Sequence, residues 1–435
     1  MKKLLLAIIT LAITTSVLKA QNISLKECVE MAIKNHPDYQ GAVLNAEVAE
    51  ANFSASKSNR LPNMQVEVYQ STNTGRSIDR FTNAYINQIY SSTYAQASLS
   101  QPIFQGFRMK HDIRSKELRV SSELHNIEAM KNDLTIRIIQ AYLNVLQAEE
   151  LLVVAKSQVA SSAQQLDRVT KQTEAGVLGK SELLQMRTQY SNDEFAKINA
   201  EGNLKQAKLA LFQLLNISPD NDYSFERLPE NMASQDFKEV SMERVFENLP
   251  EIKAADAQIK SFESQAKSIK AENLPSLNFF ADWNTFYASS NSQEMFFEQI
   301  NSTRNGSVTL GLQIPIFGRL QTSPRVQAAM IQKKVAQNQL RSSKLIIQQS
   351  YYTSLQNYDI AYEQFKNAEE QVKVNNENLE AVQAQINAGT VNAIEYILAK
   401  TNYDRAKANL VQAKYSFLLQ EKVLEFFKTG VWSLN

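Results

Sequence analysis

The sequence predicts a mostly α-helical protein with a small membrane-embedded β part, built from one unit that occurs twice. Two observations lead to this prediction. From Arg108 to Glu174 the chain has neither glycine nor proline, and its apolar residues recur every three or four positions, as on one face of a helix. The landmarks of the first half of the chain also return, in the same order and at one constant spacing, in the second half.

The first residues and the composition indicate an exported protein that is held together by packing. Lys2 and Lys3 precede an apolar run that is too short to span a bilayer, and Ala20 is the small residue expected at a signal-peptide cleavage site. Cys28 is the only cysteine, so no internal disulfide can form, and we expect its thiol to be buried in a short first helix. The basic (46) and acidic (45) side chains nearly balance, which gives no support to nucleic-acid binding.

The repeat is visible as a set of paired landmarks. The sequence Pro102-Ile103-Phe104 returns 213 positions later as Pro315-Ile316-Phe317, and Ala175-Gly176 returns with the same offset as Ala388-Gly389. We therefore divide the chain into a signal peptide (1–20), a first repeat (21–215), a linker (216–240), a second repeat (241–429) and a C-terminal tail (430–435).

Each repeat is expected to hold a long antiparallel helical hairpin. Gly176 and Gly389 are placed as helix C-caps, because glycine enters the left-handed region at little cost. Apolar residues outside the main seam, such as Ile139 and Ile346, give each long helix neighbours on two sides, as in a curved wall of helices. The expected helices of the two repeats are Asp38–Asn59 and Glu251–Asn273, Arg108–Glu174 and Thr322–Asn387, and Lys180–Leu215 and Asn392–Phe427.

Four segments between these helices alternate between apolar and polar residues, with the length that a tilted strand needs to cross an outer membrane. A soluble sheet with one polar face is the alternative, but four such strands at equivalent places favour the membrane. Aromatic residues near the strand ends are candidates for an interface girdle: Tyr69, Tyr90, Tyr94, Trp283, Phe286 and Tyr287. The residues predicted to face lipid are Met64, Val66, Val68, Ala97, Leu99, Leu277, Phe279, Trp283, Val308, Leu310, Leu312 and Ile314.

Four strands cannot form a membrane barrel by themselves. Lipid offers no hydrogen bonds to an open sheet edge, and known barrels start at about eight strands. The barrel must therefore be shared between chains. Two chains would supply eight strands and three would supply twelve, and the residues alone leave this choice open.

The ordered set of breaks, present twice at one spacing, resembles the TolC-like outer-membrane efflux protein family over the whole chain after the signal peptide. The resemblance rests on the Leu-Pro breaks, the Pro-Ile-Phe junctions and the Ala-Gly hairpin ends. It implies a homotrimer in the cell outer membrane, with a shared twelve-stranded transmembrane barrel and a long periplasmic helical tunnel. It also implies a passive exit duct of a tripartite efflux or type I secretion system that docks to a periplasmic membrane-fusion adaptor and an inner-membrane transporter.

The resemblance also assigns roles to the hairpin ends. They would form the periplasmic entrance, where Glu395 and its first-repeat equivalent Glu182 would contribute a ring of carboxylates. Equally, each could be an acid in the first turn of a helix, where the helix dipole favours it. The residues that would contact the adaptor are Gly176, Val177, Leu178, Gly389, Thr390 and Val391.

Other functions find little support in the residues. The three histidines are scattered, and no nucleophile–base grouping, phosphate loop or metal spacing is present, so we expect no enzyme, no cofactor and no metal site. A stand-alone outer-membrane porin stays open as an alternative. A soluble periplasmic coiled-coil scaffold or adaptor would need neither the four strands nor their loops.

Overall fold

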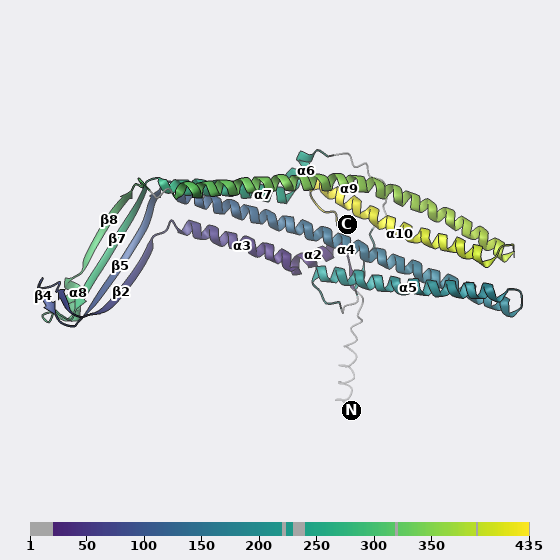
Figure 1. Ribbon diagram of the computed structural model, residues 1–435, viewed down its shortest axis with the longest axis horizontal. Helices are drawn as coiled ribbons and strands as arrows, with labels where there is room; N and C mark the ends of the chain where they lie inside the picture. Colours follow the sequence, from purple (N-terminus) through teal and green to yellow (C-terminus); the bar gives the residue numbers. More distant parts are fainter. Residues whose placement is uncertain (1–20, 220–222, 229–239, 318–320, 389, 435) are drawn as a thin grey trace, which may run out of the picture. The chain divides into compact units, whose positions relative to one another are not determined.

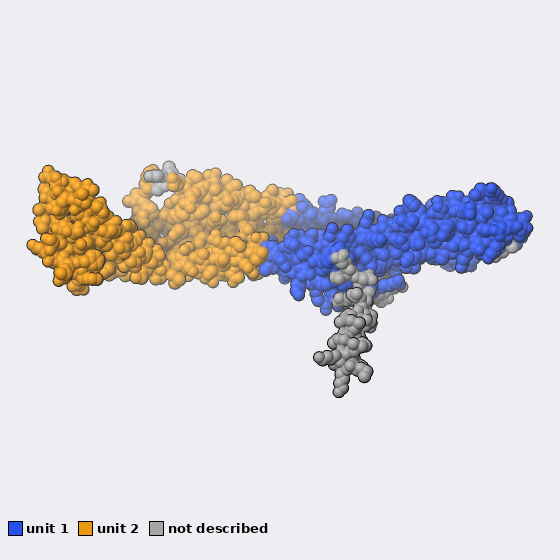
Figure 2. Space-filling view, turned by 90° about the horizontal axis from the view of Figure 1, so that it is seen from below, with its two compact units in different colours: residues 1–43, 126–250, 343–435 blue, residues 44–125, 251–342 orange. Residues whose placement is uncertain are grey.

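The computed structural model describes residues 21–219, 223–228, 240–317, 321–388 and 390–434, which form two compact units (Figure 2). Unit 1 is drawn from residues 1–43, 126–250 and 343–435, and unit 2 from residues 44–125 and 251–342. Each unit therefore takes segments from both predicted repeats. The predicted signal peptide and Gly389 lie outside the described residues.

The helices begin and end close to the predicted positions (Figure 1). The helices expected to begin at Asp38 and Glu251 start one residue earlier, at Pro37 and Pro250, because the fixed φ of proline suits the first turn of a helix. The helices are α2 (Leu25–Asn35), α3 (Pro37–Ser58), α4 (Arg108–Glu174), α5 (Lys180–Leu215), α6 (Met242–Asn248), α7 (Pro250–Lys270, continued by the 3-10 turn η1, Ala271–Asn273), α8 (Phe296–Ser302), α9 (Thr322–Asn387) and α10 (Ala393–Thr429).

Unit 2 contains the antiparallel four-stranded sheet, in the order β2-β5-β7-β8. Its strands are β2 (Asn63–Asn73), β5 (Tyr90–Gln105), β7 (Ser276–Ala288) and β8 (Asn305–Gln313). Strand β5 is longer than predicted, because it continues through Pro102. An irregularity in its pairing with β7, between Pro102 and Phe104, accommodates the proline. The loop between β2 and β5 holds a small hairpin, β3 (Arg76–Ile78) with β4 (Tyr85–Asn87), and α8 lies between β7 and β8.

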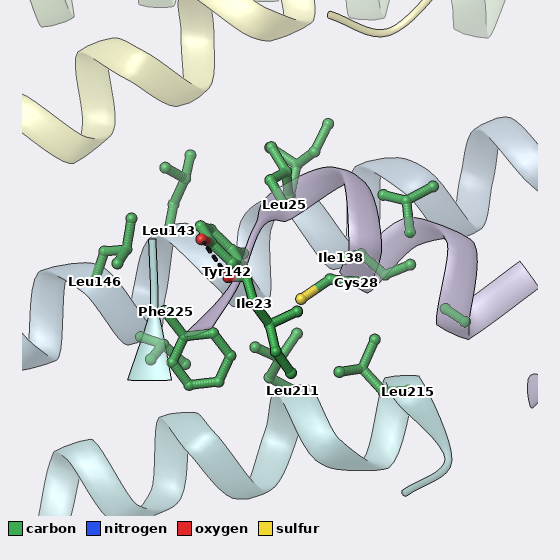
Figure 3. Close-up of a cluster of buried hydrophobic side chains, with 14 of the residues drawn as sticks. Ile23, Leu25, Cys28, Ile138, Tyr142, Leu143, Leu146, Leu211, Leu215 and Phe225 are labelled. Carbon is green, nitrogen blue, oxygen red and sulfur yellow. Dashed lines mark hydrogen bonds between the residues drawn. The ribbon is translucent and has the colours of Figure 1, made fainter. Parts of the chain in front are cut away.

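Unit 1 is built around an apolar core that Figure 3 shows in close-up. Strand β1 (Gln21–Ile23) pairs in parallel with β6 (Tyr223–Phe225), and α4 supplies Tyr142, whose hydroxyl lies 3.1 Å from the Ile23 carbonyl oxygen and 2.6 Å from that of Glu226. Fully burying a large apolar side chain contributes about 1.5–3 kcal/mol to the stability of the fold. This cluster therefore holds the first described residues of unit 1 in place.

Cys28 is fully buried in this core, as predicted, and burial raises the pKa of its thiol to about 12. Of the described residues, those of α4 make the one helix long and apolar enough to cross a membrane by length and composition. Side chains of this same helix, such as Ile138 and Leu143, fill the core of unit 1.

In unit 2, small side chains let α4 and α7 approach closely. The Ser115 hydroxyl lies 3.0 Å from the Ser261 carbonyl oxygen, and the Ser261 hydroxyl donates to the Ser115 carbonyl oxygen at 2.8 Å. Two turns further on, Ser122 donates to the Ala254 carbonyl oxygen at 2.9 Å. These buried polar pairs replace a large apolar contact, so the two backbones come near each other with their polar groups satisfied.

Candidate functional site

Both helical hairpins turn at the same end of unit 1 (Figure 1). At the end of α4, Gly176 has a φ of +73°, its amide donates to the Thr173 carbonyl oxygen at 3.0 Å, and the Val177 amide donates to Gln172 at 2.9 Å. This pair of bonds is a Schellman motif, so the predicted C-cap is confirmed for Gly176. At the end of α9, Thr390 donates to the Gln385 carbonyl oxygen at 3.0 Å, which is the equivalent longer bond.

The two predicted entrance glutamates occupy the same position of the two return helices, but their surroundings differ. Asn392 caps α10 by accepting from the amides of Ile394 and Glu395, and Glu395 itself is exposed. Helix α5 starts after Gly179, which has no side chain to cap it. Glu182 folds back over this glycine, so that an added Cβ would lie 2.8 Å from its Oε2 atom. Glu182 therefore fits the helix-dipole interpretation better than Glu395 does.

The predicted adaptor contacts differ in exposure at both hairpins. At the first hairpin Val177 is 71% exposed, while Leu178 is half-buried. At the second hairpin Thr390 is exposed and Val391 is half-buried. Sequence reasoning missed three exposed apolar residues on the first two turns of the return helices. They add to the exposed surface of the hairpin ends: Leu184, Ile394 and Leu398.

Sequence reasoning also missed a buried ionic cluster that joins α5 to α10. Lys400 is 2% exposed, and its Nζ lies 3.2 Å from Asp193 and 2.5 Å from Asp404. Burial opposes the charge on Lys400, but its hydrogen bonds and the charges of the two aspartates outweigh burial and hold the pKa of Lys400 above its usual value. The ammonium group is therefore charged at neutral pH and ties the two return helices together.

The register of the sheet separates an apolar face from a polar one. Met64 pairs with Leu99, which pairs with Ala281, which pairs with Val308, so these four side chains share a face. All of the predicted lipid-facing residues on strands lie on this face, and most are exposed. Ile314, which was also predicted to face lipid, is not on a strand, because β8 ends one residue earlier, at Gln313. The opposite face carries Gln65, Glu67, Gln96, Asp282 and Asn284.

The same register divides the six aromatic residues that the sequence grouped as an interface girdle. Trp283 and Tyr287 lie on the apolar face. Tyr69, Tyr94 and Phe286 pair across three strands on the polar face, and Tyr90 has the same orientation on β5. The girdle interpretation was therefore wrong for these four, because side chains continue to alternate up to the loop ends of β2, β5 and β7 and this alternation turns the four rings to the polar face.

Among the described residues, no group of three or more histidine, cysteine, aspartate or glutamate side chains is placed to hold a metal ion. The chemical character of the site thus lies in two surfaces, an apolar sheet face and a set of hairpin ends.

Comparison with known proteins agrees with this arrangement. The family model described as "Outer membrane efflux protein" matches residues 28–216 and 242–426. Outer membrane protein TolC of Escherichia coli is 23% identical, over all of this chain and 87% of the relative, and TolC of Vibrio cholerae is 22% identical over 96% and 93%.

Solved structures show the same fold. The CmeC outer membrane channel of Campylobacter jejuni superposes with a TM-score of 0.79 at 17% identity, covering 97% of this chain and 92% of that one. The outer membrane protein VceC of Vibrio cholerae gives 0.80 at 12%, covering 94% and 97%. The chain therefore belongs to the outer membrane efflux protein family of channels, and its location is the cell outer membrane, with a long periplasmic helical portion.

Proposed function

We propose that this protein is the outer-membrane exit duct of a tripartite efflux or type I secretion system, working as a passive homotrimer without enzymatic activity or cofactor. The observation that carries the proposal is the four-stranded sheet, which has one exposed apolar face and two edge strands, β2 and β8, within a family of outer-membrane channels. Lipid cannot pair with those edges, so β8 of one copy would pair with β2 of the next.

The helices offer matching surfaces for such an assembly. Leu184, Phe195, Ile198 and Leu209 are all exposed on α5, and at ~100° per residue they fall within about 60° of one another around the helix. Along α9 and α10 runs an open groove of about 840 Å³, lined by Ile360, Ala368 and Ala413. A stripe on one copy and a groove on another make a head-to-tail contact, which closes into a ring at three copies.

The hairpin ends would be the periplasmic entrance of the duct. Three copies would bring Glu395, with Glu182 beside it, into a ring of carboxylates that favours cations. The adaptor, and through it the inner-membrane pump, would contact Gly176, Val177 and Leu178 on one hairpin and Gly389, Thr390 and Val391 on the other. Replacing Glu395 by Gln should lower the cation preference of single channels, and an unchanged preference would contradict the ring.

One fractionation experiment tests the main proposal. The chain should be found in the outer membrane and, without heating, should migrate in detergent gels at about three times its mass of 49.2 kDa. Recovery as a soluble periplasmic protein would overturn the proposal and favour a scaffold. A stand-alone porin would instead support solute passage across whole cells when adaptor and pump are deleted, whereas the duct would lose export.

A further inference from the structure

The loop between β7 and β8 carries an exposed apolar cluster formed by Met295, Phe296 and Phe297. Met295 is 79% and Phe297 82% exposed, and Phe296 also reaches the surface. Solvated loops seldom present three consecutive large apolar side chains to water, so such a patch indicates a contact surface.

The cluster is held firmly in place. Gln299 of α8 is fully buried, accepts from the Ala288 amide at 3.0 Å and donates to the carbonyl oxygens of Asn291 (3.1 Å) and Glu294 (2.8 Å). Thr303 accepts from the Phe286 amide at 2.9 Å. These bonds continue the edge of β7 beyond the last residue that pairs with β8, so α8 is part of the sheet's framework.

Helix α8 packs on the apolar side of the sheet. Thr285 and Tyr287 alternate with the polar-face residues of β7 and share the apolar face with Trp283. The Thr285 hydroxyl donates to the Ile300 carbonyl oxygen at 2.6 Å, and the Tyr287 ring lies 4.8 Å from that of Phe296. The cluster therefore extends the surface that the proposed function places against lipid.

The loop between β2 and β5 packs on the opposite, polar face of the sheet. Phe81 and Arg80 pack on the ring of Phe286, at 6.2 Å and 4.8 Å, and Phe286 belongs to the polar face. The Ser77 hydroxyl contacts that of Tyr90, also on the polar face, at 3.3 Å. Tyr85 is an exposed residue of this loop, which packs against the polar face, and it provides a natural control.

Strand geometry places α8 at the outer boundary of the membrane. The ten steps from Leu277 to Tyr287 span about 33 Å at ~3.3 Å per residue, and a tilt of ~40° reduces this to about 25 Å along the membrane normal. That is about the height of the apolar band of outer-membrane barrels. Aromatic side chains prefer the boundary between such a band and water.

We propose that Met295, Phe296 and Phe297 form an interfacial anchor, which inserts between the outer-leaflet lipids at the border of their acyl chains and head groups. The inference rests on the proposed function, since it needs the apolar face of the sheet to meet lipid. Three copies would place three such anchors around the outer rim.

Tryptophan quenching in vesicles tests the anchor. The full chain, carrying Trp432→Phe and Trp283→Phe with either Phe297→Trp or Tyr85→Trp, is reconstituted into phosphatidylcholine brominated at carbons 6,7 or 11,12. A third variant, Trp432→Phe alone, reports on the sheet through Trp283. We expect the tryptophan at 297 to lose at least half of its emission in the 6,7-brominated lipid and less in the other, and the one at 85 to respond to aqueous acrylamide only.

Each outcome decides between the proposals. If Trp283 is quenched by brominated lipid but the tryptophan at 297 is not, the anchor is overturned. Quenching of the tryptophan at 297 by acrylamide would then show that this position faces water. Protection from acrylamide would show that a second copy covers it. If Trp283 also escapes the bromines, the membrane sheet itself fails. Because Cys28 is fully buried, Met295→Cys can be labelled alone with a polarity-sensitive dye, and its emission should shift to the blue in vesicles.

Discussion

Helices α5 and α10 follow equivalent turns of the two repeats, yet within a single chain they differ in how many of their side chains are buried. Twelve side chains of α10 are buried, among them Tyr396, Phe417 and Leu418, against five of α5. The duplicated pattern thus sets the length and the direction of both helices, while individual residues decide which helix lies in the interior. The exposed side of α5 is the one that a second copy would cover.

The ionic cluster shows the same divergence at the level of single residues. With the 213-residue offset, Lys400 corresponds to Arg187, which is exposed, Asp404 to Ser191, and Asp193 to Ala406. Arg187 keeps the positive charge of Lys400 but is exposed, and neither aspartate has an acidic counterpart, so the cluster that spans the two repeats has no symmetry-related copy. The four predictions below test this difference, beginning with the largest expected effect.

Replacing Lys400 by Met should lower the free energy of unfolding by about 3–5 kcal/mol, because it leaves the buried carboxylate of Asp193 and the half-buried one of Asp404 without their cation. The repeat offers a matched control, since Arg187→Met changes an exposed residue and should alter stability by no more than about 0.5 kcal/mol. Urea unfolding followed by circular dichroism measures both. Equal losses in the two variants would contradict the special role of the ionic cluster.

Alkaline pH should separate the native chain from one that lacks the cluster. The folded-state pKa of Lys400 is raised above that of an unfolded lysine, so its contribution to stability is present below the unfolded pKa and is lost as pH rises through the folded pKa. The triple variant Asp193→Asn, Lys400→Met, Asp404→Asn should lose less stability above this pH than the native chain does. Parallel curves of unfolding free energy against pH would refute the assignment.

Gly176→Ala should destabilise the first hairpin by about 1–2 kcal/mol, because its φ of +73° is strained for any residue with a Cβ. An added Cβ there meets no atom within 4 Å, so the cost is one of backbone strain. Gly202→Ala inside α5 is the control: alanine suits a helix interior, and an added Cβ there also meets no atom within 4 Å. Thermal unfolding should rank Gly176→Ala below Gly202→Ala, and the reverse order would count against the cap geometry.

The smallest difference concerns the starts of the return helices. Asn392→Ala removes a side chain that accepts from two amides and should cost about 1 kcal/mol. Gly179→Asn would supply a similar cap to α5 and should gain a few tenths of a kcal/mol. Hydrogen exchange at the first turns of α5 and α10 measures both, and no change in exchange at α10 would show that Asn392 does not act as a cap.

Much of the fold could be predicted because proline and glycine mark its boundaries. The bounds of α4, α5 and α9 agree with the sequence prediction, since Gly176 and the Pro-Ile-Phe junctions leave few alternatives. The apolar face of the sheet also followed from alternation. Strand β5 shows the limit of such marks, because it continues through Pro102 at an irregular strand end that tolerates the proline.

What could not be predicted depends on how distant segments pack. Lys400 and Asp193 meet only because α10 lies against α5, and no local pattern distinguishes Lys400 from a solvated lysine. Helix α8 is too short for a periodic signal, and its anchoring by Gln299 and Thr303 involves β7 backbone groups that a sequence does not place.

The pairing of β1 with β6 has a consequence for the order of folding. Ile23 is held by Phe225 and by Tyr142, so the first strand has no partner until the chain beyond the first hairpin is available. Unit 1 also takes its last helix, α10, from the far part of the sequence. Contacts at such separation form late and slowly, because the intervening loop must first be closed. During export, this unit would therefore remain open until almost the whole chain has arrived.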